Sequence, residues 1–241
     1  MGITINRPIE YTKGEVKTRD LHVSVNRKLF LGEGAYGKVF VAKHDPTKAV
    51  KKSWHPMTRE YNIGAQLHHE NFVKIHALFI KHFPNFQNRY KLVMERIIGK
   101  PLKNIPSNSL PFTITLPLMQ QAVDSCLYLF DRNIAWDDIH GGNLYIEESP
   151  PKLIIADFGF WEKINDPSHL TTALMRGLRM LLFFLLETSS DLSPQERKQL
   201  IRILHTEIDD LKALAEEITQ WISLCKDRRP ESHAKEPRPL S

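Results

Sequence analysis

Three oxygen-bearing side chains in the second half of the chain have the types and spacing that phosphoryl transfer requires. Asp138 and Asn143 lie in one loop-like stretch, and Asp157 opens an Asp-Phe-Gly turn fourteen residues after Asn143. Transfer of a phosphoryl group needs a carboxylate beside the attacking hydroxyl and oxygen ligands for magnesium. We predict that these three side chains supply them, although a lone Asp-Phe-Gly is more often an ordinary turn.

A glycine-rich segment near the N-terminus could lie against phosphate groups. It reads Gly-Glu-Gly-Ala-Tyr-Gly, with its glycines at Gly32, Gly34 and Gly37, and glycine lets a backbone approach phosphates closely. A dinucleotide-binding fold would place a helix after such a segment, whereas residues 38–42 continue as a strand. The pattern therefore favours a loop between two strands that covers the phosphates of a nucleotide.

A lysine and a glutamate follow this loop at positions that suit nucleotide binding. Side chains alternate along a strand, so Ala49 and Lys51 share one face, where a small residue can cover adenine and a lysine can reach phosphates. Glu60, in a predicted short helix, can hold Lys51 by an ion pair. Taken alone, each charge has a plainer interpretation as a solvated surface group. A Lys51→Ala variant is expected to lose turnover and still fold, because a lysine on a strand face contributes little to a core.

The elements that must position these residues are strands in the first part of the chain and mostly helices in the second. Alternating and periodic patterns predict strands or helices over 27–53, 56–68, 73–80, 90–95, 116–131, 144–147, 153–156 and 170–187. A capping box at Ser193 opens further helical pattern that continues to Cys225.

The predicted fold class is α+β, with a boundary at the breaker Gly99-Lys100-Pro101. The first lobe is small and strand-rich, and the second is helical. The predicted parts are an N-terminal extension (1–26), an N-terminal lobe (27–98), a C-terminal lobe (99–231) and a disordered tail (232–241).

Composition narrows the classes of protein and partner. The 241 residues are 41% hydrophobic, with a net charge of +5 that suits phosphate-bearing ligands or acidic partners. Lysines and arginines are scattered, so no nucleic-acid partner is expected. Two isolated cysteines indicate a reducing, cytoplasmic compartment. The longest apolar block, residues 180–186, is too short for a membrane span, and no signal peptide is apparent.

Five motifs follow one another along the chain: the glycine-rich segment, Lys51, Glu60, the stretch from Asp138 to Asn143, and the Asp157 turn. In this chain order they resemble the motifs of the protein kinase superfamily, and the resemblance covers about residues 28–231. Asp138 lies five residues before Asn143, which is the family's spacing between catalytic base and asparagine, and this selects Asp138 over Asp137. The resemblance implies ATP with Mg2+ or Mn2+, Asn143 and Asp157 as metal ligands, and Arg229 in a late motif of the second lobe. It also implies a nucleotide site formed by Leu31, Gly32, Gly34, Gly37, Val39, Ala49, Lys51, Met94, Glu95, Ile97 and Tyr145.

The chain departs from the family at several places. Trp136 and Asp137 replace the usual His-Arg before the base, His140 replaces the catalytic-loop lysine, and the activation segment is nearly absent. The first hypothesis is a constitutively active serine/threonine protein kinase in which Lys51, Glu60, Asp138 and His140 serve catalysis. Asp-x-His-x-Gly-Asn is also similar to small-molecule kinases of the aminoglycoside and choline type. A third hypothesis is a pseudokinase that binds partners without turnover.

The reduced activation segment resembles minimal bacterial effector kinases, which act as virulence factors in the host. This resemblance implies secretion by a bacterium into the host cytosol and a host protein substrate. A host heat-shock chaperone is one such substrate in that group.

Overall fold

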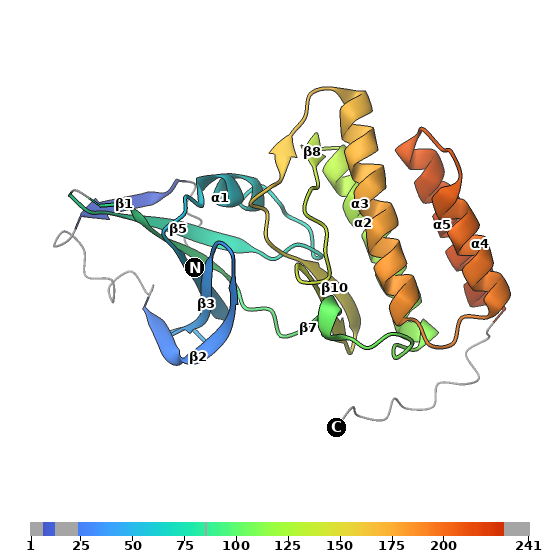
Figure 1. The fold of residues 1–241 in the computed structure, drawn as a ribbon, viewed down its shortest axis with the longest axis horizontal. Coiled ribbons are helices and arrows are strands. Elements are labelled where there is room, and N and C mark those ends of the chain that lie inside the picture. The colour runs from blue at the N-terminus through green and yellow to red at the C-terminus, as the bar shows by residue number, and fades with distance from the viewer. Residues whose placement is uncertain (1–6, 13–23, 85, 229–241) are drawn as a thin grey trace. The chain divides into compact units, whose positions relative to one another are not determined.

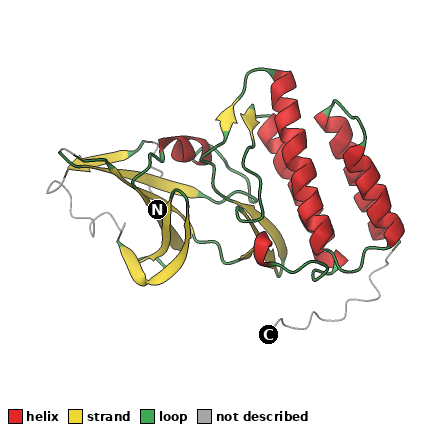
Figure 2. Cartoon of the chain, in the orientation of Figure 1, coloured by secondary structure: helices red, strands yellow, loops and turns green. Residues whose placement is uncertain are grey.

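The protein folds into two compact units (Figure 1). In its computed structural model, residues 7–12, 24–84 and 86–228 are described. Unit 1 combines the described residues up to Asn104 with Trp136–Lys163, and unit 2 combines Ile105–Ala135 with the described residues from Ile164. Unit 1 holds most of the strands and unit 2 the long helices (Figure 2). The predicted α+β class, with strands first and helices after, is confirmed.

A six-stranded sheet dominates unit 1. In spatial order its strands are β1 (Ile9–Thr12), β5 (Ile75–His82), β6 (Arg89–Glu95), β4 (Lys48–Ser53), β3 (Gly37–Ala42) and β2 (Val25–Gly34). Neighbouring strands are antiparallel except for the β1–β5 pair, which is parallel. The predicted glycine-rich segment is the turn between β2 and β3.

The two faces of this sheet carry different side chains. Lys51 and Ala49 lie on one face of β4, and Val50 lies on the other, as the alternation of side chains requires. Val50 belongs to a buried apolar cluster of Tyr11, Ala42, Val50, Ala77, Phe79 and Val93. Tyr11 comes from β1, so part of the predicted N-terminal extension is a strand of the sheet.

The other elements of unit 1 hold the loops with the predicted catalytic groups. They are α1 (Thr58–Gly64), β7 (Lys100–Pro101), the 3-10 helix η1 (Leu102–Asn104), β9 (Leu144–Glu148), β10 (Pro151–Ile155) and β11 (Glu162–Lys163). β10, β9 and β7 form a three-stranded sheet in that order. Backbone bonds from Val73 to Ile155 (2.9 Å) and from Ile155 to Asn71 (2.7 Å) join this region to the segment before β5. Trp136–Lys163, which follows the boundary predicted at Gly99, thus belongs to the same compact unit as the six-stranded sheet.

The described residues of unit 2 form four helices and the short strand β8 (Ile134–Ala135). The helices are α2 (Phe112–Phe130), α3 (Pro167–Thr188), α4 (Pro194–His205) and α5 (Leu211–Asp227). The predicted capping box at Ser193 is confirmed, since its side chain accepts from Glu196 N and the Glu196 side chain bonds back. The pattern expected to run to Cys225 is two helices, because Asp210 caps a new helix after a break at Thr206.

Among the described helices, α3 alone is long and apolar enough to cross a membrane by length and composition. This is a weak indication of a span, because 56% of its apolar window is buried inside the protein, as in a core helix. Arg229, the tail from 232 and most of the extension before 26 lie outside the described residues.

Candidate active site

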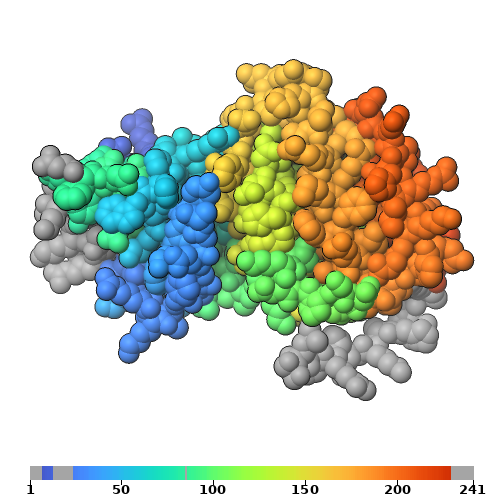
Figure 3. Space-filling view, in the orientation of Figure 1, coloured from blue at the N-terminus to red at the C-terminus, as the bar shows by residue number. Residues whose placement is uncertain are grey.

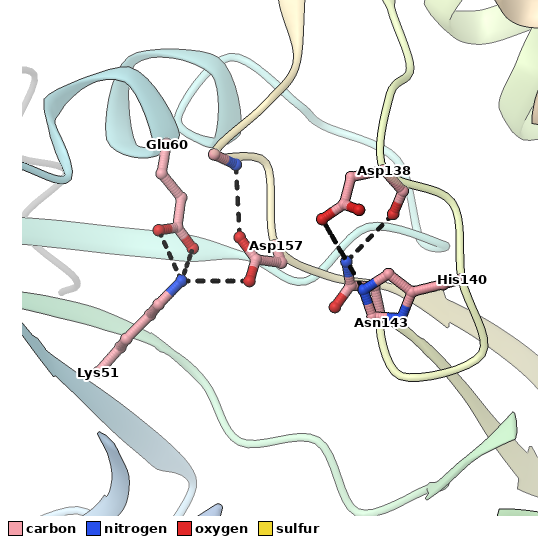
Figure 4. Close-up of polar contacts among 7 residues, drawn as sticks. Lys51, Glu60, Asp138, His140, Asn143 and Asp157 are labelled. Carbon is pink, nitrogen blue, oxygen red and sulfur yellow. Dashed lines mark hydrogen bonds and ion pairs between the residues drawn. The ribbon is translucent and has the colours of Figure 1, made fainter. Parts of the chain in front are cut away.

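Lys51, Glu60 and Asp157 meet in a charged cluster on one side of the sheet (Figure 4). The Lys51 ammonium lies 2.9 Å from Glu60 Oε2 and 3.3 Å from Asp157 Oδ2. Burial lowers the pKa of Lys51, but the two carboxylates more than offset this and hold the pKa above its usual value. The ammonium therefore stays charged at neutral pH.

Burial of this ion pair overturns one expectation from the sequence. Lys51 is 7% exposed and Glu60 is 5% exposed, so Lys51 is a core residue rather than a lysine on an open strand face. Asp157 keeps a third of its side chain exposed, so it can reach a ligand while it contacts Lys51. The cluster thus has a buried structural pair and one accessible carboxylate.

Close packing of a glycine holds the helix that carries Glu60. A Cβ atom on Gly64, the last residue of α1, would lie 2.5 Å from Ile75 Cγ1 and 2.6 Å from Phe158 Cδ2. Phe158 is the middle residue of the Asp-Phe-Gly turn and is fully buried. The absence of a side chain at Gly64 therefore lets α1 pack directly on the turn that carries Asp157.

Asp138, His140 and Asn143 form a second group in the loop before β9. The Asn143 amide Nδ2 donates to the Asp138 carbonyl (3.2 Å) and lies 3.5 Å from Asp138 Oδ2. His140 Nδ1 accepts from Gly142 N at 3.0 Å, so in the neutral ring Nε2 carries the proton. That Nε2 lies 3.8 Å from Asp138 Oδ2. The imidazole N–H and the carboxylate therefore face the same region.

Backbone contacts tie the two groups together. Ala156 N donates to the Asn143 carbonyl at 2.9 Å, immediately before Asp157. Asp138 and Asp157 both have left-handed backbones, with φ of 62° and 64°. Such conformations are uncommon outside glycine and cluster at functional sites, because they aim a side chain that regular structure would point elsewhere.

The donor set fits a magnesium ion that is shared with a nucleotide. Asn143 uses its amide nitrogen toward Asp138, which leaves Oδ1 for a metal, and Asp157 offers a part-exposed carboxylate. In the described part of the chain no three His, Cys, Asp or Glu side chains form a metal-binding group. Magnesium commonly takes one or two protein oxygens and completes its shell with substrate phosphates and water, so two ligands suffice.

The predicted nucleotide site lies on the Lys51 face of the sheet or at its edge. Ala49 is paired with Met94 and Lys51 with Val39 across neighbouring strands, and Gly32 is opposite Val39. Ala49 and Met94 are buried, Ile97 is half-buried, and Leu31 is 44% exposed. Gly34 and Gly37 close the β2–β3 turn.

Two of the predicted nucleotide contacts gain detail from the structure. The Glu95 N–H is donated to the Lys74 carbonyl at 2.8 Å, so Glu95 can offer adenine only its carbonyl. Burial, together with Asp157, raises the pKa of Tyr145, and Lys51 lowers it. The Tyr145 hydroxyl is therefore close enough to the charged cluster for its pKa to depend on both the Asp157 carboxylate and the Lys51 ammonium.

Arg59, for which the sequence pattern predicted no role, links α1 to the segment after Asp157. Its Nε donates to the Trp161 carbonyl (2.8 Å), and its NH2 group donates to the Phe160 carbonyl (3.2 Å) and contacts Glu162 (3.1 Å). Because Glu60 is the next residue, these bonds also fix the helix that carries it. Backbone acceptors have no sequence signature, so only the adjacent charges Arg59-Glu60 could have suggested this contact.

Trp136 has a packing role that explains one departure from the family pattern. Its ring is fully buried and stacks on Trp161, with centroids 5.9 Å apart and planes 5° apart. Trp161 also meets Phe158 and Phe72 edge-on at 4.8 and 5.7 Å. The residue before Asp137 therefore anchors the predicted catalytic loop to the segment after Asp157 by aromatic packing.

Comparison with known proteins agrees with this geometry. The protein kinase domain family matches residues 25–177, which include all the site residues above. The probable serine/threonine-protein kinase glkA of Dictyostelium discoideum is 28% identical over 144 residues. The match covers 58% of this chain, and the chain spans 30% of the length of that relative.

Proposed function

Because this chain belongs to the protein kinase domain family, we propose that it is an active serine/threonine protein kinase. The observation that carries the proposal is the buried Lys51–Glu60 pair at 2.9 Å, joined to Asp157 at 3.3 Å. An assembled lysine–glutamate pair beside the Asp-Phe-Gly aspartate is what phosphoryl transfer in this family requires. Protein kinases generally use ATP and Mg2+, and we assign both to this site.

In the proposed reaction, a substrate hydroxyl oxygen bonds to the γ-phosphorus as the bond to the ADP oxygen breaks. Asp138 orients that hydroxyl and accepts its proton. Lys51 binds the phosphates, and Asn143 and Asp157 would hold magnesium, which neutralises charge on the phosphates. His140 donates its Nε2–H to the transferred group in place of the family's lysine.

A phosphate-transfer assay tests the class of acceptor. Purified protein with radiolabelled ATP is offered generic protein substrates and, separately, aminoglycosides and choline. We expect label on serine or threonine of protein. Label only on the small molecules would support a small-molecule kinase, a hypothesis that His140 and the short activation segment also favour. No label on any acceptor would support a pseudokinase.

The enzyme is proposed to be active as made. Conventional kinases often pair a phosphate on the activation loop with the arginine before the base, but Asp137 occupies that place and would repel a phosphate. Arg59 already ties α1 to Phe160 and Trp161 without any phosphate. This contact supplies the link that loop phosphorylation provides elsewhere.

Replacing Arg59 with methionine is expected to lower kcat/KM for ATP about tenfold, because hydrogen bonds from a charged donor are each worth about 1.5–3 kcal/mol. Glu162→Gln is the matched control, since it removes only a half-exposed ion pair that contributes little. Steady-state kinetics with an Arg59→Lys variant complete the test. Equal loss in Glu162→Gln and Arg59→Met would assign the effect to the ion pair instead of the carbonyl contacts.

Ser168 is expected not to regulate activity. It lies at the start of α3, where its backbone N and hydroxyl donate to the Asp166 cap at 2.9 and 2.8 Å. Phosphatase treatment and Ser168→Ala should therefore leave the initial rate unchanged. A lag that preincubation with ATP removes, or loss of rate in Ser168→Ala, contradicts activity as made.

The bacterial-effector and chaperone-substrate hypotheses rest on the reduced activation segment alone. We retain them as the narrower form of the proposal. The chaperone-substrate hypothesis is tested with host lysate as the source of substrate, by comparison of complete lysate with lysate from which the heat-shock chaperone has been depleted.

A further inference from the structure

Three lysines stand opposite one another on the sheet face away from Lys51. The strand register pairs Lys38 with Lys52, and Lys52 with Lys91. Lys81 and Arg89 form another cationic pair on the neighbouring strands. Like charges placed directly opposite each other destabilise a sheet, so this arrangement has a stability cost.

The pKa shifts agree with mutual repulsion. Burial lowers the pKa of Lys52, and Arg89 and Arg27 lower it further. Burial lowers the pKa of Lys91 to about 8, with Lys52, Arg89 and Lys81 adding to the effect. The cations therefore raise the local positive potential on this face.

A cavity of about 310 Å³ lies at the glycine-loop end of this face. Lys38, Lys52, His55 and Arg89 line it together with Phe40 and Trp54. Among the described residues that line the cavity, Glu33 is the one acidic side chain, and it pairs with Lys38 at 3.1 Å with both side chains more than half exposed. Within that described lining, the positive charges of Lys38, Lys52 and Arg89 outnumber the single carboxylate of Glu33.

Aromatic rings hold the cationic groups in position. The Arg89 guanidinium carbon lies 4.9 Å from the centre of the Trp54 ring, and Lys52 Nζ lies 5.4 Å from the centre of the Phe40 ring. Cation–π contacts orient a charge without neutralising it. Trp54 is 49% exposed, so the cavity offers an apolar wall as well as charge.

We propose that this cavity binds a phosphorylated side chain of a protein segment, with Lys52 and Arg89 on the phosphate. Clusters of arginine and lysine are a recurring means of recognising phosphorylated motifs. The apolar wall of Trp54 and Phe40 suits the peptide around the phosphate better than a bare ion. This proposal rests on the proposed function in one respect, because a protein kinase acts on proteins that carry phosphorylated side chains.

The rest of this face argues against a nucleic-acid ligand. A nucleic-acid backbone needs a cationic track along several phosphates. Here the cations give way to the apolar cluster around Val50 and Phe79 on the same face. A single phosphorylated side chain needs only the local group.

The cavity also lies against the outer side of the glycine loop. Gly34 and Gly37 line it, and a Cβ on Gly37 would lie 2.5 Å from the Lys52 carbonyl oxygen. Figure 3 shows the blue β2–β3 hairpin beside the lighter blue residues that follow β4 on the molecular surface. A phosphorylated segment bound here would contact the loop that is predicted to cover the nucleotide.

Fluorescence anisotropy with a labelled phosphoserine peptide library, degenerate on both sides, tests this site. The unphosphorylated library is the reference, and a non-hydrolysable ATP analogue with Mg2+ saturates the active site. We expect phosphate-dependent binding that Lys52→Met or Arg89→Gln weakens at least tenfold. Lys43→Met, an exposed lysine just after the far end of β3, should leave binding unchanged.

Several results would overturn the proposal. One is equal binding of the phosphorylated and unphosphorylated libraries, and another is equal binding by wild type and the cavity variants. A third is that inorganic phosphate or single-stranded RNA displaces the labelled peptides as effectively as unlabelled phosphopeptides do. Failure of this site is separable from failure of the proposed function. Asp138→Asn should lose phosphate transfer and keep phosphopeptide binding, whereas the cavity variants should lose binding and keep transfer to a generic substrate.

Discussion

Replacing Asp138 with asparagine is expected to lower kcat by about 10³-fold with little change in KM for ATP. A positioned general base contributes about 10²–10⁴ to a rate, and Asp138 is assigned to the hydroxyl substrate rather than to the nucleotide. Loss of an interaction made only in the transition state lowers kcat and leaves substrate binding intact. Asparagine is the suitable replacement because it tolerates the left-handed backbone at this position, where φ is 62°.

Asp137→Asn is the matched control, since it makes the same change one residue earlier in the same loop. We expect a clearly smaller loss of kcat, because Asp138 is the carboxylate that lies beside the Asn143 amide and the His140 imidazole. Steady-state kinetics of both variants, with thermal melts to confirm folding, decide the matter. If Asp137→Asn proved the more damaging, the assignment of the base would be wrong.

The motifs predicted the charged cluster well because each element of it is local in sequence. Lys51 follows from strand alternation, Glu60 from the short helix and Asp157 from the turn it opens. The structure places the Lys51 ammonium within 3.3 Å of both the Glu60 and the Asp157 carboxylates. Their burial could not be predicted in the same way, since it depends on α1 packing on the Asp-Phe-Gly turn through Gly64.

Contacts between distant segments were beyond the reach of the sequence. β1 is four residues long and pairs with β5, about seventy positions later, without any local signal. Arg59 binds backbone carbonyls, which every residue possesses, and Trp136 stacks on a ring 25 positions away. The opposed lysines Lys38 and Lys52 follow from strand register, which a pattern of alternating residues leaves undetermined.

Lys51→Met is expected to destabilise the protein by about 3–5 kcal/mol as well as to abolish transfer. Removal of one partner of a buried ion pair leaves the other charge without compensation, and Glu60 is 5% exposed. A second substitution, Glu60→Met, should bring the free energy of unfolding back to within about 1 kcal/mol of wild type, because apolar replacement of a whole buried pair is often neutral. Activity should stay lost in the double variant, since no lysine remains to bind phosphates.

The pH dependence of stability separates this explanation from simple loss of packing. Burial is the largest cause that raises the pKa of Glu60, Asp157 adds to it, and Lys51 opposes both. In Lys51→Met the opposition is gone, so the folded-state pKa of Glu60 rises further above its unfolded value. Such a group costs no stability below its unfolded pKa, near 4.3. The cost grows as pH rises from the unfolded pKa to the folded-state pKa, because over this range the folded state binds more protons than the unfolded state. Chemical denaturation of Lys51→Met should therefore show the free energy of unfolding falling, relative to Lys51→Met/Glu60→Met, between about pH 4.3 and 7. A constant difference between these two variants across that range would mean that the buried glutamate charge is not the cause.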